Sequence, residues 1–260
     1  MKKNIKKVII KFFNWISYFS NTNQIKLIYY HDVVSNGGNS YMQITSESFY
    51  NQMKYLKDYG YITLNFKDLD NKEYDSEGKS VLITFDDGWL SNYETVFPIM
   101  KELNLKFNIF LEVGAIGKKE NYLTWDMVNE MMNSNLVGFG AHTFNHIDAR
   151  TIDDCNVNLE IIKSNELIKE KTNLITKDFC FPYGYYNKET INYIENLGVY
   201  DRLYTSDGIS IIIRNDIKIF GRVGIENEDS MKDFINKLEG RYNLYYSTIN
   251  KVRKYIGGEN

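Results

Sequence analysis

Histidine, cysteine and proline are scarce in this chain of 260 residues, which contains three, two and two of them respectively. Two cysteines cannot build the disulfide framework of a small secreted domain. A single bridge is the alternative, but two free thiols are the expected state of Cys155 and Cys180. The net charge of −3 excludes the strongly basic surface of a protein that binds nucleic acid. With 43% hydrophobic residues and no proline-rich linker, the chain has enough apolar material for one large core or two small ones.

The N-terminal region lacks an apolar run long enough to cross a membrane. Lys11 and Asn14 interrupt the apolar stretch at 8–19, which is shorter than the ~20 residues of a spanning helix, and no Ala-x-Ala cleavage pattern follows it. The stretch is basic and amphipathic, which indicates either a helix in a membrane interface, with contact through residues 1–21, or a helix docked on the domain. We therefore expect a basic amphipathic segment at 1–24, followed by one domain at 25–260.

From residue 25 onward, short apolar runs alternate with longer segments of helical periodicity. Ser46 and Thr124 are expected to cap helices, and Gly198 is expected to end one. Repeated βα units predict an α/β fold with a mainly parallel sheet, either open or closed into a barrel, and residues 226–260 are expected to form a helical extension. The expected strands are 25–30, 81–85, 107–111, 136–139, 179–181, 203–205 and 217–223, and the expected helices are 46–59, 93–103, 125–132, 153–171 and 188–197.

Chemically active side chains follow several of these expected strands directly. His31, Asp86, Asp87, His142 and Pro182 each stand just after the carboxyl end of one. In a parallel barrel these ends meet at one rim, which is where active sites form. Residues far apart in the sequence are therefore expected to converge on one site.

Asp86 and Asp87 are followed by Gly88, at the end of a β-branched apolar strand. Neighbouring side chains on a regular strand point to opposite faces, but a bend at glycine allows both carboxylates to approach one site. One carboxylate is then available to bind a metal and the other to act as a base. Taken alone, an Asp-Asp-Gly sequence more commonly forms a turn without catalytic function.

His142 and His146 are four residues apart, a spacing that places both imidazoles on one face of a helical turn. Two histidines and one carboxylate are a zinc ligand set that leaves a coordination position for water. Two surface histidines are the alternative, and the pair gains weight from the two aspartates at a neighbouring strand end.

Together these segments resemble the ordered motifs of the NodB-type polysaccharide deacetylases, carbohydrate esterase family 4. The resemblance implies a distorted (β/α) barrel with about seven parallel strands. It also implies Zn²⁺ or another divalent transition metal bound by Asp87, His142 and His146. In this family the first aspartate, here Asp86, is the general base, and the backbone N–H of the tyrosine, here Tyr183, binds the oxyanion. The matching motifs lie within residues 25–225 and read Thr84-Phe85-Asp86-Asp87-Gly88, His142-Thr143-x-x-His146 and Phe181-Pro182-Tyr183-Gly184.

Two features depart from the pattern of many family members. The proline motif begins at Cys180 and lacks the arginine that others hold against the catalytic aspartate, and no histidine follows His146 to serve as the acid. Both departures resemble the branch of biofilm poly-N-acetylglucosamine deacetylases, whose first strand carries a Tyr-His-Asp segment like residues 30–32. That resemblance implies His31 as the catalytic acid, with Asp32 a candidate partner for its ring. Arg222 is a candidate replacement for the missing arginine, although a structural arginine is the common case.

The implied reaction is hydrolysis of the acetamide in N-acetylhexosamine residues of a cell-surface polysaccharide, by a membrane-associated or extracellular enzyme. Trp89, Pro182 and Tyr185 are the best-placed candidates for substrate contact. A related amidohydrolase acting on a small C–N substrate is one alternative. A non-catalytic sugar-binding domain is another, and the complete set of base, ligands and acid argues against it.

Overall fold

The computed structural model describes residues 25–36, 38, 40–71, 78–208 and 211–241. The expected amphipathic segment at 1–24 and residues 242–260 of the expected extension lie outside this part. The described part of the extension contains helix α8 (Met231–Leu238), which begins with a capping box between Ser230 and Asp233. Among the described residues, no helix has the length and apolar character needed to cross a bilayer.

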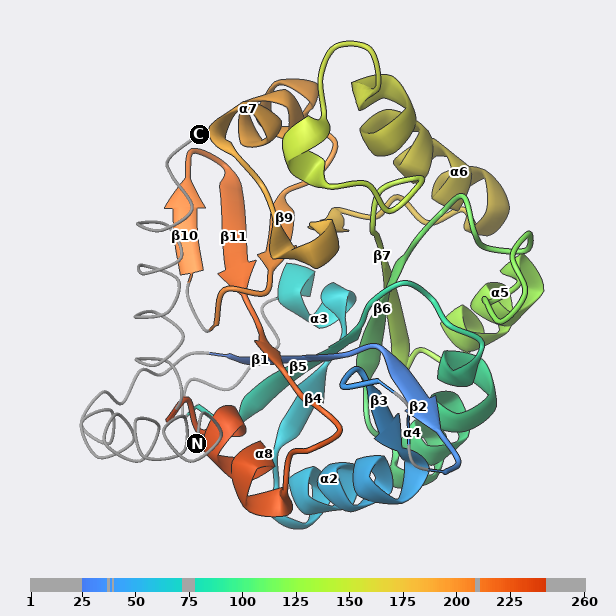
Figure 1. The fold of residues 1–260 in the computed structure, drawn as a ribbon, viewed down its shortest axis with the longest axis vertical. Coiled ribbons are helices and arrows are strands. Elements are labelled where there is room, and N and C mark those ends of the chain that lie inside the picture. The colour runs from blue at the N-terminus through green and yellow to red at the C-terminus, as the bar shows by residue number, and fades with distance from the viewer. Residues whose placement is uncertain (1–24, 37, 39, 72–77, 209–210, 242–260) are drawn as a thin grey trace.

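A barrel of parallel strands forms the centre of the domain, with helices around its outside (Figure 1). The central strands of the barrel are mostly buried, as expected where both faces of a parallel sheet are covered. The expected barrel with about seven parallel strands is confirmed. The neighbouring parallel strands are, in order, β9 (Arg202–Thr205), β8 (Asp178–Cys180), β7 (Val137–Ala141), β6 (Phe107–Leu111), β5 (Ser80–Phe85) and β1 (Lys26–Tyr30).

One interrupted stretch of chain closes this barrel. Strand β11 (Ile217–Gly221) pairs with β9, and β12 (Val223–Gly224) pairs with β1, both in parallel. Only Arg222 separates the two strands. The single strand expected at 217–223 is therefore split into two strands, and Arg222 lies at the break between them in the barrel wall.

A second irregularity distorts the barrel between β5 and β6. The short strand β4 (Ile62–Leu64) pairs with the first half of β5, and β6 pairs only with its last two residues. The buried Asn108 side chain bridges the junction: its amide donates to the carbonyls of Leu64 and Ile83, at 3.0 and 3.1 Å, and its oxygen accepts from the N–H of Phe66 at 2.8 Å. These bonds satisfy backbone groups that a regular ladder would otherwise pair.

Helix α3 (Phe66–Asn71) covers the amino-terminal end of the barrel and lies inside the ring of outer helices in Figure 1. Asp68 binds Lys106, just before β6, at 2.6 Å, and Asp70 binds Arg202, the first residue of β9. Arg202 also forms a buried ion pair with Asp178, the first residue of β8. Because this end is closed, side-chain chemistry is directed to the carboxyl ends of the strands.

The outer helices agree with the expected ones, with two corrections. Thr45, not Ser46, caps α2 (Ser46–Asp58), because its extended backbone allows its hydroxyl to accept from the N–H of Ser48. The helices expected at 93–103 and 153–171 each contain a π-helical turn, Asn92–Val96 and Asn158–Ile162. Thr124 and Gly198 cap and end helices as expected. The remaining outer helices are α4 (Phe97–Leu103), α5 (Trp125–Asn133), α6 (Lys163–Thr172) and α7 (Lys188–Leu197).

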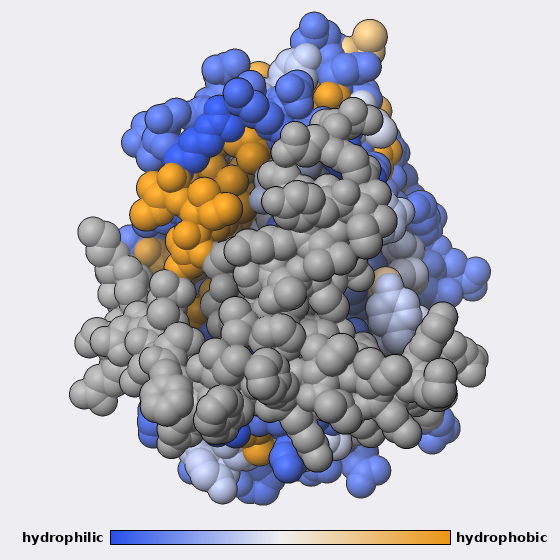
Figure 2. All heavy atoms as spheres, turned by 60° about the vertical axis from the view of Figure 1, so that its left-hand side comes forward, coloured by the Kyte–Doolittle hydropathy of each residue, from blue (hydrophilic) through white to orange (hydrophobic). Residues whose placement is uncertain are grey.

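Four short strands were not expected from the sequence, and β4, described above, is one of them. Strands β2 (Asp32–Val34) and β3 (Gln43–Thr45) form a separate parallel pair, and β10 (Ile211–Arg214) adds an antiparallel edge to β11. Ile212 and Ile213 of β10 are exposed, and Figure 2 shows apolar residues gathered on the side of the molecule that carries this strand.

Candidate active site

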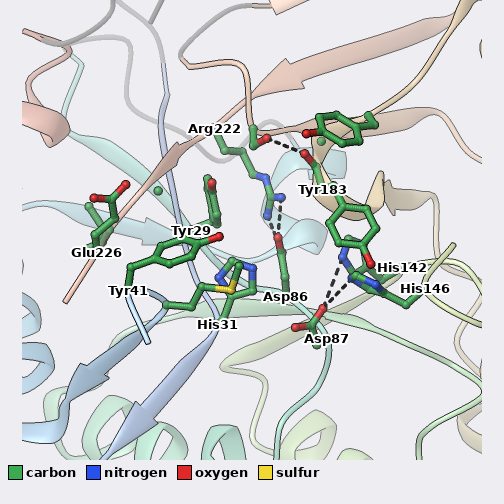
Figure 3. Close-up of a pocket in the computed structure, with 16 residues that line it drawn as sticks. Tyr29, His31, Tyr41, Asp86, Asp87, His142, His146, Tyr183, Arg222 and Glu226 are labelled. Carbon is green, nitrogen blue, oxygen red and sulfur yellow. Dashed lines mark hydrogen bonds and ion pairs between the residues drawn. The ribbon is translucent and has the colours of Figure 1, made fainter. Parts of the chain in front are cut away.

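A cavity of about 310 Å³ lies at the carboxyl ends of the barrel strands (Figure 3). His31 follows β1, Asp86 and Asp87 follow β5, His142 follows β7 and Tyr183 lies after β8. All five line the cavity, so the prediction that these distant segments converge on one rim is confirmed.

Asp87, His142 and His146 form a compact group of possible metal ligands. The Nε2 atoms of His142 and His146 lie 3.6 and 3.2 Å from Asp87 Oδ1, and the ligand atoms of all three residues lie within 4.8 Å of one another. Asp87 Oδ1 is buried and has no aligned hydrogen-bond donor among the described residues. One carboxylate and two imidazoles around an orphaned oxygen fit Zn²⁺ or a similar divalent ion.

The tautomer of His142 suits this role. Its Nδ1 lies 2.7 Å from the carbonyl oxygen of Cys180, which can only accept, so Nδ1 carries the proton and Nε2 presents its lone pair to the group. Burial lowers the pKa of His142 to about 4, and the ring is therefore neutral near pH 7.

Trp89 supports the group from outside the cavity. Its indole Nε1 donates to Asp87 Oδ2 at 2.9 Å, and the ring packs on Tyr122 with 4.6 Å between centroids. Trp89 does not line the cavity, in contrast to the expectation that it contacts substrate. The indole instead orients the carboxylate so that Oδ1 faces the two histidines.

Left-handed backbone is concentrated at this site. Asp87, Thr143, His146 and Tyr183 have φ values of 76°, 59°, 55° and 60°, and the other non-glycine residues with positive φ in the described part are all asparagines. The expectation that 142–146 forms a helical turn is therefore wrong, although the two imidazoles do meet. Such conformations are costly and persist where surrounding contacts impose them.

Asp86 is held by Arg222, as predicted. Nη1 and Nη2 of Arg222 donate to Oδ1 and Oδ2 of Asp86 at 2.7 and 2.8 Å, and both side chains are buried (Figure 3). Burial alone would raise the pKa of Asp86, but the charge and hydrogen bonds of Arg222 hold that pKa below its usual range. The carboxylate thus stays ionised beside the group of ligands.

A buried aspartate paired with arginine, next to an Asp-His-His group at the rim of a parallel barrel, indicates a hydrolytic site. The family model for polysaccharide deacetylases matches residues 73–201. The chain carries a polysaccharide deacetylase domain.

Two curated relatives cover most of this domain. YxkH of Bacillus subtilis, named as a polysaccharide deacetylase, is 31% identical over 189 residues, covering 71% of this chain and 66% of YxkH. The poly-beta-1,6-N-acetyl-D-glucosamine N-deacetylase of Staphylococcus aureus is 25% identical over 203 residues, covering 72% of this chain and 64% of that enzyme. The chain therefore spans just under two thirds of the length of either relative.

A solved structure supports the same fold. The deacetylase PplD of Streptococcus pyogenes, in a complex with acetate, superposes with a TM-score of 0.71 at 23% identity, covering 82% of this chain and 97% of PplD. At this level of identity, the match with PplD supports the shared barrel fold alone.

His31 lies in the cavity of the deacetylase domain without the expected partner. The Asp32 carboxylate accepts from Ser91 Oγ at 2.6 Å and from Gln43 Nε2 at 2.9 Å, and is therefore occupied elsewhere. Within the described residues, no hydrogen bond to the His31 ring is formed. The ring packs edge-on against Tyr29, and Asn92 fixes the His31 carbonyl with a bond of 3.2 Å.

The proline motif of the deacetylase domain forms one wall of the cavity. Tyr183 sits in a tight turn at Pro182–Gly184, and its ring packs edge-on against His146. Gly184 has a φ of +71°, and an added Cβ would lie 2.0 Å from Ser206 Oγ, so only glycine fits there. Tyr185 lines the cavity as expected, whereas Pro182 is buried and does not line it.

Sequence reasoning missed the surroundings of Arg222. Its guanidinium lies over the rings of Tyr29 and Phe110, 4.7 and 5.2 Å from their centroids, and contacts the Cys180 sulfur. Both cysteines are free, as expected, and burial raises the pKa of the Cys180 thiol well above its usual range. The sequence signal for this packing was the absence of arginine from the proline motif, where Cys180 instead contacts Arg222.

Proposed function

We propose that this domain is a metal-dependent hydrolase that removes acetyl groups from N-acetylhexosamine residues of a cell-surface polysaccharide. The main support for this proposal is a single cavity that contains both the Asp87-His142-His146 group and Asp86, an aspartate that Arg222 keeps ionised. His31 lines the same cavity and is the residue that we assign as the acid.

The residues of the chain divide the proton transfers of amide hydrolysis between them. Asp86 accepts a proton from the attacking water, and Arg222 orients its carboxylate for this step. The C–N bond then breaks, and His31 donates a proton to the departing nitrogen, because an amine anion is a very poor leaving group. Water and acetamide are thereby converted to acetate and an amine.

Charge on the acetamide oxygen requires stabilisation as the water attacks. A divalent metal held by Asp87, His142 and His146 would supply Lewis acidity and a bound water of lowered pKa. The backbone N–H of Tyr183 is assigned as a donor to the developing oxyanion. The left-handed turn at Tyr183, held in place by Gly184, is the feature that supports this assignment.

The rim of the cavity favours a polymer over a small C–N substrate. Tyr41, Tyr183 and Tyr185 line it and are 62%, 59% and 48% exposed, which leaves aromatic faces for sugar rings beyond the reacting unit. The S. aureus relative is named for a polymer of N-acetylglucosamine. We therefore infer a polymeric substrate of this class and a location at the cell surface, either extracellular or associated with the membrane.

Release of acetate from N-acetylglucosamine oligomers tests this function directly. The full chain, purified and loaded with zinc, is expected to release one acetate for each amine formed, and to lose this activity after treatment with a chelator. Readdition of zinc is expected to restore it. The Asp86→Asn variant serves as the matched control, because the ligand group is kept while the base is lost.

Small N-acetyl compounds, including acetylated amino acids and monosaccharides, separate the alternatives. Faster turnover of these compounds than of the oligomers would replace the proposal with a small-substrate amidohydrolase. Oligomer binding without acetate release in the zinc-loaded protein would leave a sugar-binding domain.

A further inference from the structure

A buried carboxylate lies behind the histidine loop, which we define as residues 142–146. Glu160, on the π-helical turn Asn158–Ile162, is only 2% exposed. Its Oε2 accepts from the backbone N–H groups of Phe144 and Asn145, both at 3.0 Å, and its Oε1 accepts from Asn145 Nδ2 at 2.7 Å. Within the described part of the chain, no cation forms an ion pair with it. A buried carboxylate without a cation is costly, so the donors of the loop are what hold it there.

The carbonyl side of the same loop is held by a second segment. Val113 N–H donates to the Thr143 carbonyl at 3.2 Å, and Gly114 N–H donates to the Phe144 carbonyl at 2.8 Å. A Cβ on Gly114 would lie 2.5 Å from that carbonyl oxygen, which shows how closely the two backbones approach. The loop is therefore hydrogen-bonded on both sides: its N–H groups donate to Glu160, and its carbonyls accept from the segment after β6.

These contacts explain a backbone that its own sequence does not favour. Thr143 and His146 both adopt left-handed φ, and β-branched threonine is disfavoured there. Without the three bonds to Glu160, the donor groups of Phe144 and Asn145 would lose their acceptor, and the loop would relax towards ordinary conformations. His146 would then move away from Asp87, because it stands at the end of the strained segment.

Glu160 stands on a π-helical turn, an irregularity that supports a functional role for this residue. Such turns occur mostly as local irregularities in helices, often at functional sites. Ser164 Oγ donates to the Glu160 carbonyl at 2.7 Å, and this bond stabilises the turn.

We propose that Glu160 is a positioning residue for the metal ligand His146: it fixes the left-handed loop that brings His146 to Asp87 and His142. This inference rests on the proposed metal site. Contacts in the layer outside metal ligands typically change metal affinity by ~10–100-fold when they are removed.

Four variants of the full chain test this role. Glu160→Leu removes all three bonds at similar volume, and Glu160→Asp keeps the charge but is too short to reach both backbone donors. Glu160→Gln is the conservative rescue, because its carbonyl oxygen can replace Oε2. Asn165→Ala is the matched control: Asn165 is buried on the adjoining helix α6 and donates to the Thr176 carbonyl, away from the loop.

The first measurement is the zinc dissociation constant, determined by competition with a chromophoric chelator. Glu160→Leu and Glu160→Asp are expected to weaken zinc binding by ~10–100-fold, whereas Glu160→Gln and Asn165→Ala remain within about threefold of the wild type. Wild-type affinity in both the leucine and aspartate variants would overturn the proposal, as would equal weakening in Asn165→Ala. If the leucine variant does not fold, the comparison of aspartate with glutamine decides.

The second measurement is amide hydrogen exchange over residues 142–147 in the metal-free proteins. Faster exchange is expected in Glu160→Leu and Glu160→Asp, and unchanged exchange in Asn165→Ala. This readout separates two failures. A wild-type chain that binds no zinc refutes the proposed metal site, whereas unchanged exchange in the Glu160 variants refutes the role of Glu160.

Discussion

Replacement of Arg222 by methionine is expected to be among the most destabilising single changes at the rim. The guanidinium is 1% exposed and forms a two-bonded pair with Asp86, which is 4% exposed. It also donates to Thr84 Oγ1 at 2.8 Å and to the Thr205 carbonyl at 3.2 Å. In Arg222→Met, Asp86 would remain as a buried charge without a cation.

The magnitude follows from this burial. Removal of one partner from a buried ion pair costs about 3–5 kcal/mol, most of which is the penalty for the remaining charge. For a domain of this size, that corresponds to a fall in melting temperature of about 6–20 °C. The double variant Asp86→Asn, Arg222→Met should recover part of the loss, because no uncompensated charge remains.

Urea denaturation measures the free energies of unfolding of the wild type, the two single variants and the double variant, which together form a double-mutant cycle. Arg150→Met is the control, because Arg150 forms an exposed pair with Asp148, with side chains 50% and 26% exposed, and should cost at most about 1 kcal/mol. A loss in Arg222→Met no larger than that of the control would refute the reasoning. A double variant less stable than Arg222→Met would also contradict it.

Three further predictions concern the roles of individual residues. His142→Ala should abolish both zinc binding and acetate release, and bound zinc at wild-type affinity in a dialysis measurement would remove this residue from the ligand set. Asp86→Asn should keep zinc but lower kcat by ~10²–10⁴-fold, and near-normal turnover would mean that Asp86 is not the base. His31→Ala should bind zinc normally and lose activity mainly in kcat, whereas a change confined to KM would indicate a substrate-binding role instead.

The sequence predicted those strands and helices whose bounds are set by signals within the segment itself. Strand 107–111 and helix 188–197 were expected with the bounds that the structure has, because apolar runs and a glycine stop are local signals. Convergence of His31, Asp86 and His142 was also predictable, since parallel strands end at one rim. The pairing of Arg222 with Asp86 was reached through a family resemblance.

What failed depends on contacts from elsewhere in the fold. The histidine loop was expected to be helical because of its spacing, but Glu160 and Gly114 impose a left-handed path that spacing does not reveal. Asp32 adjoins His31 in sequence, yet Ser91 and Gln43 take both of its oxygens. Trp89 was assigned to substrate from its position alone, whereas the packing of Tyr122 turns it towards Asp87.

Arg222 stands much later in the chain than the other residues argued to carry the chemistry of this site. All three candidate metal ligands and Asp86 have been synthesised once residue 146 is made, but Arg222 stands 136 residues after Asp86, at the break in the stretch that closes the barrel. A nascent or truncated chain that ends before this break contains every candidate ligand, while Asp86, the proposed base, lacks its counter-charge. Local opening of the same stretch in the finished protein would likewise separate Arg222 from Asp86. The ion pair that holds Asp86 is therefore tied to barrel closure, whereas the candidate metal ligands all stand outside the closing stretch.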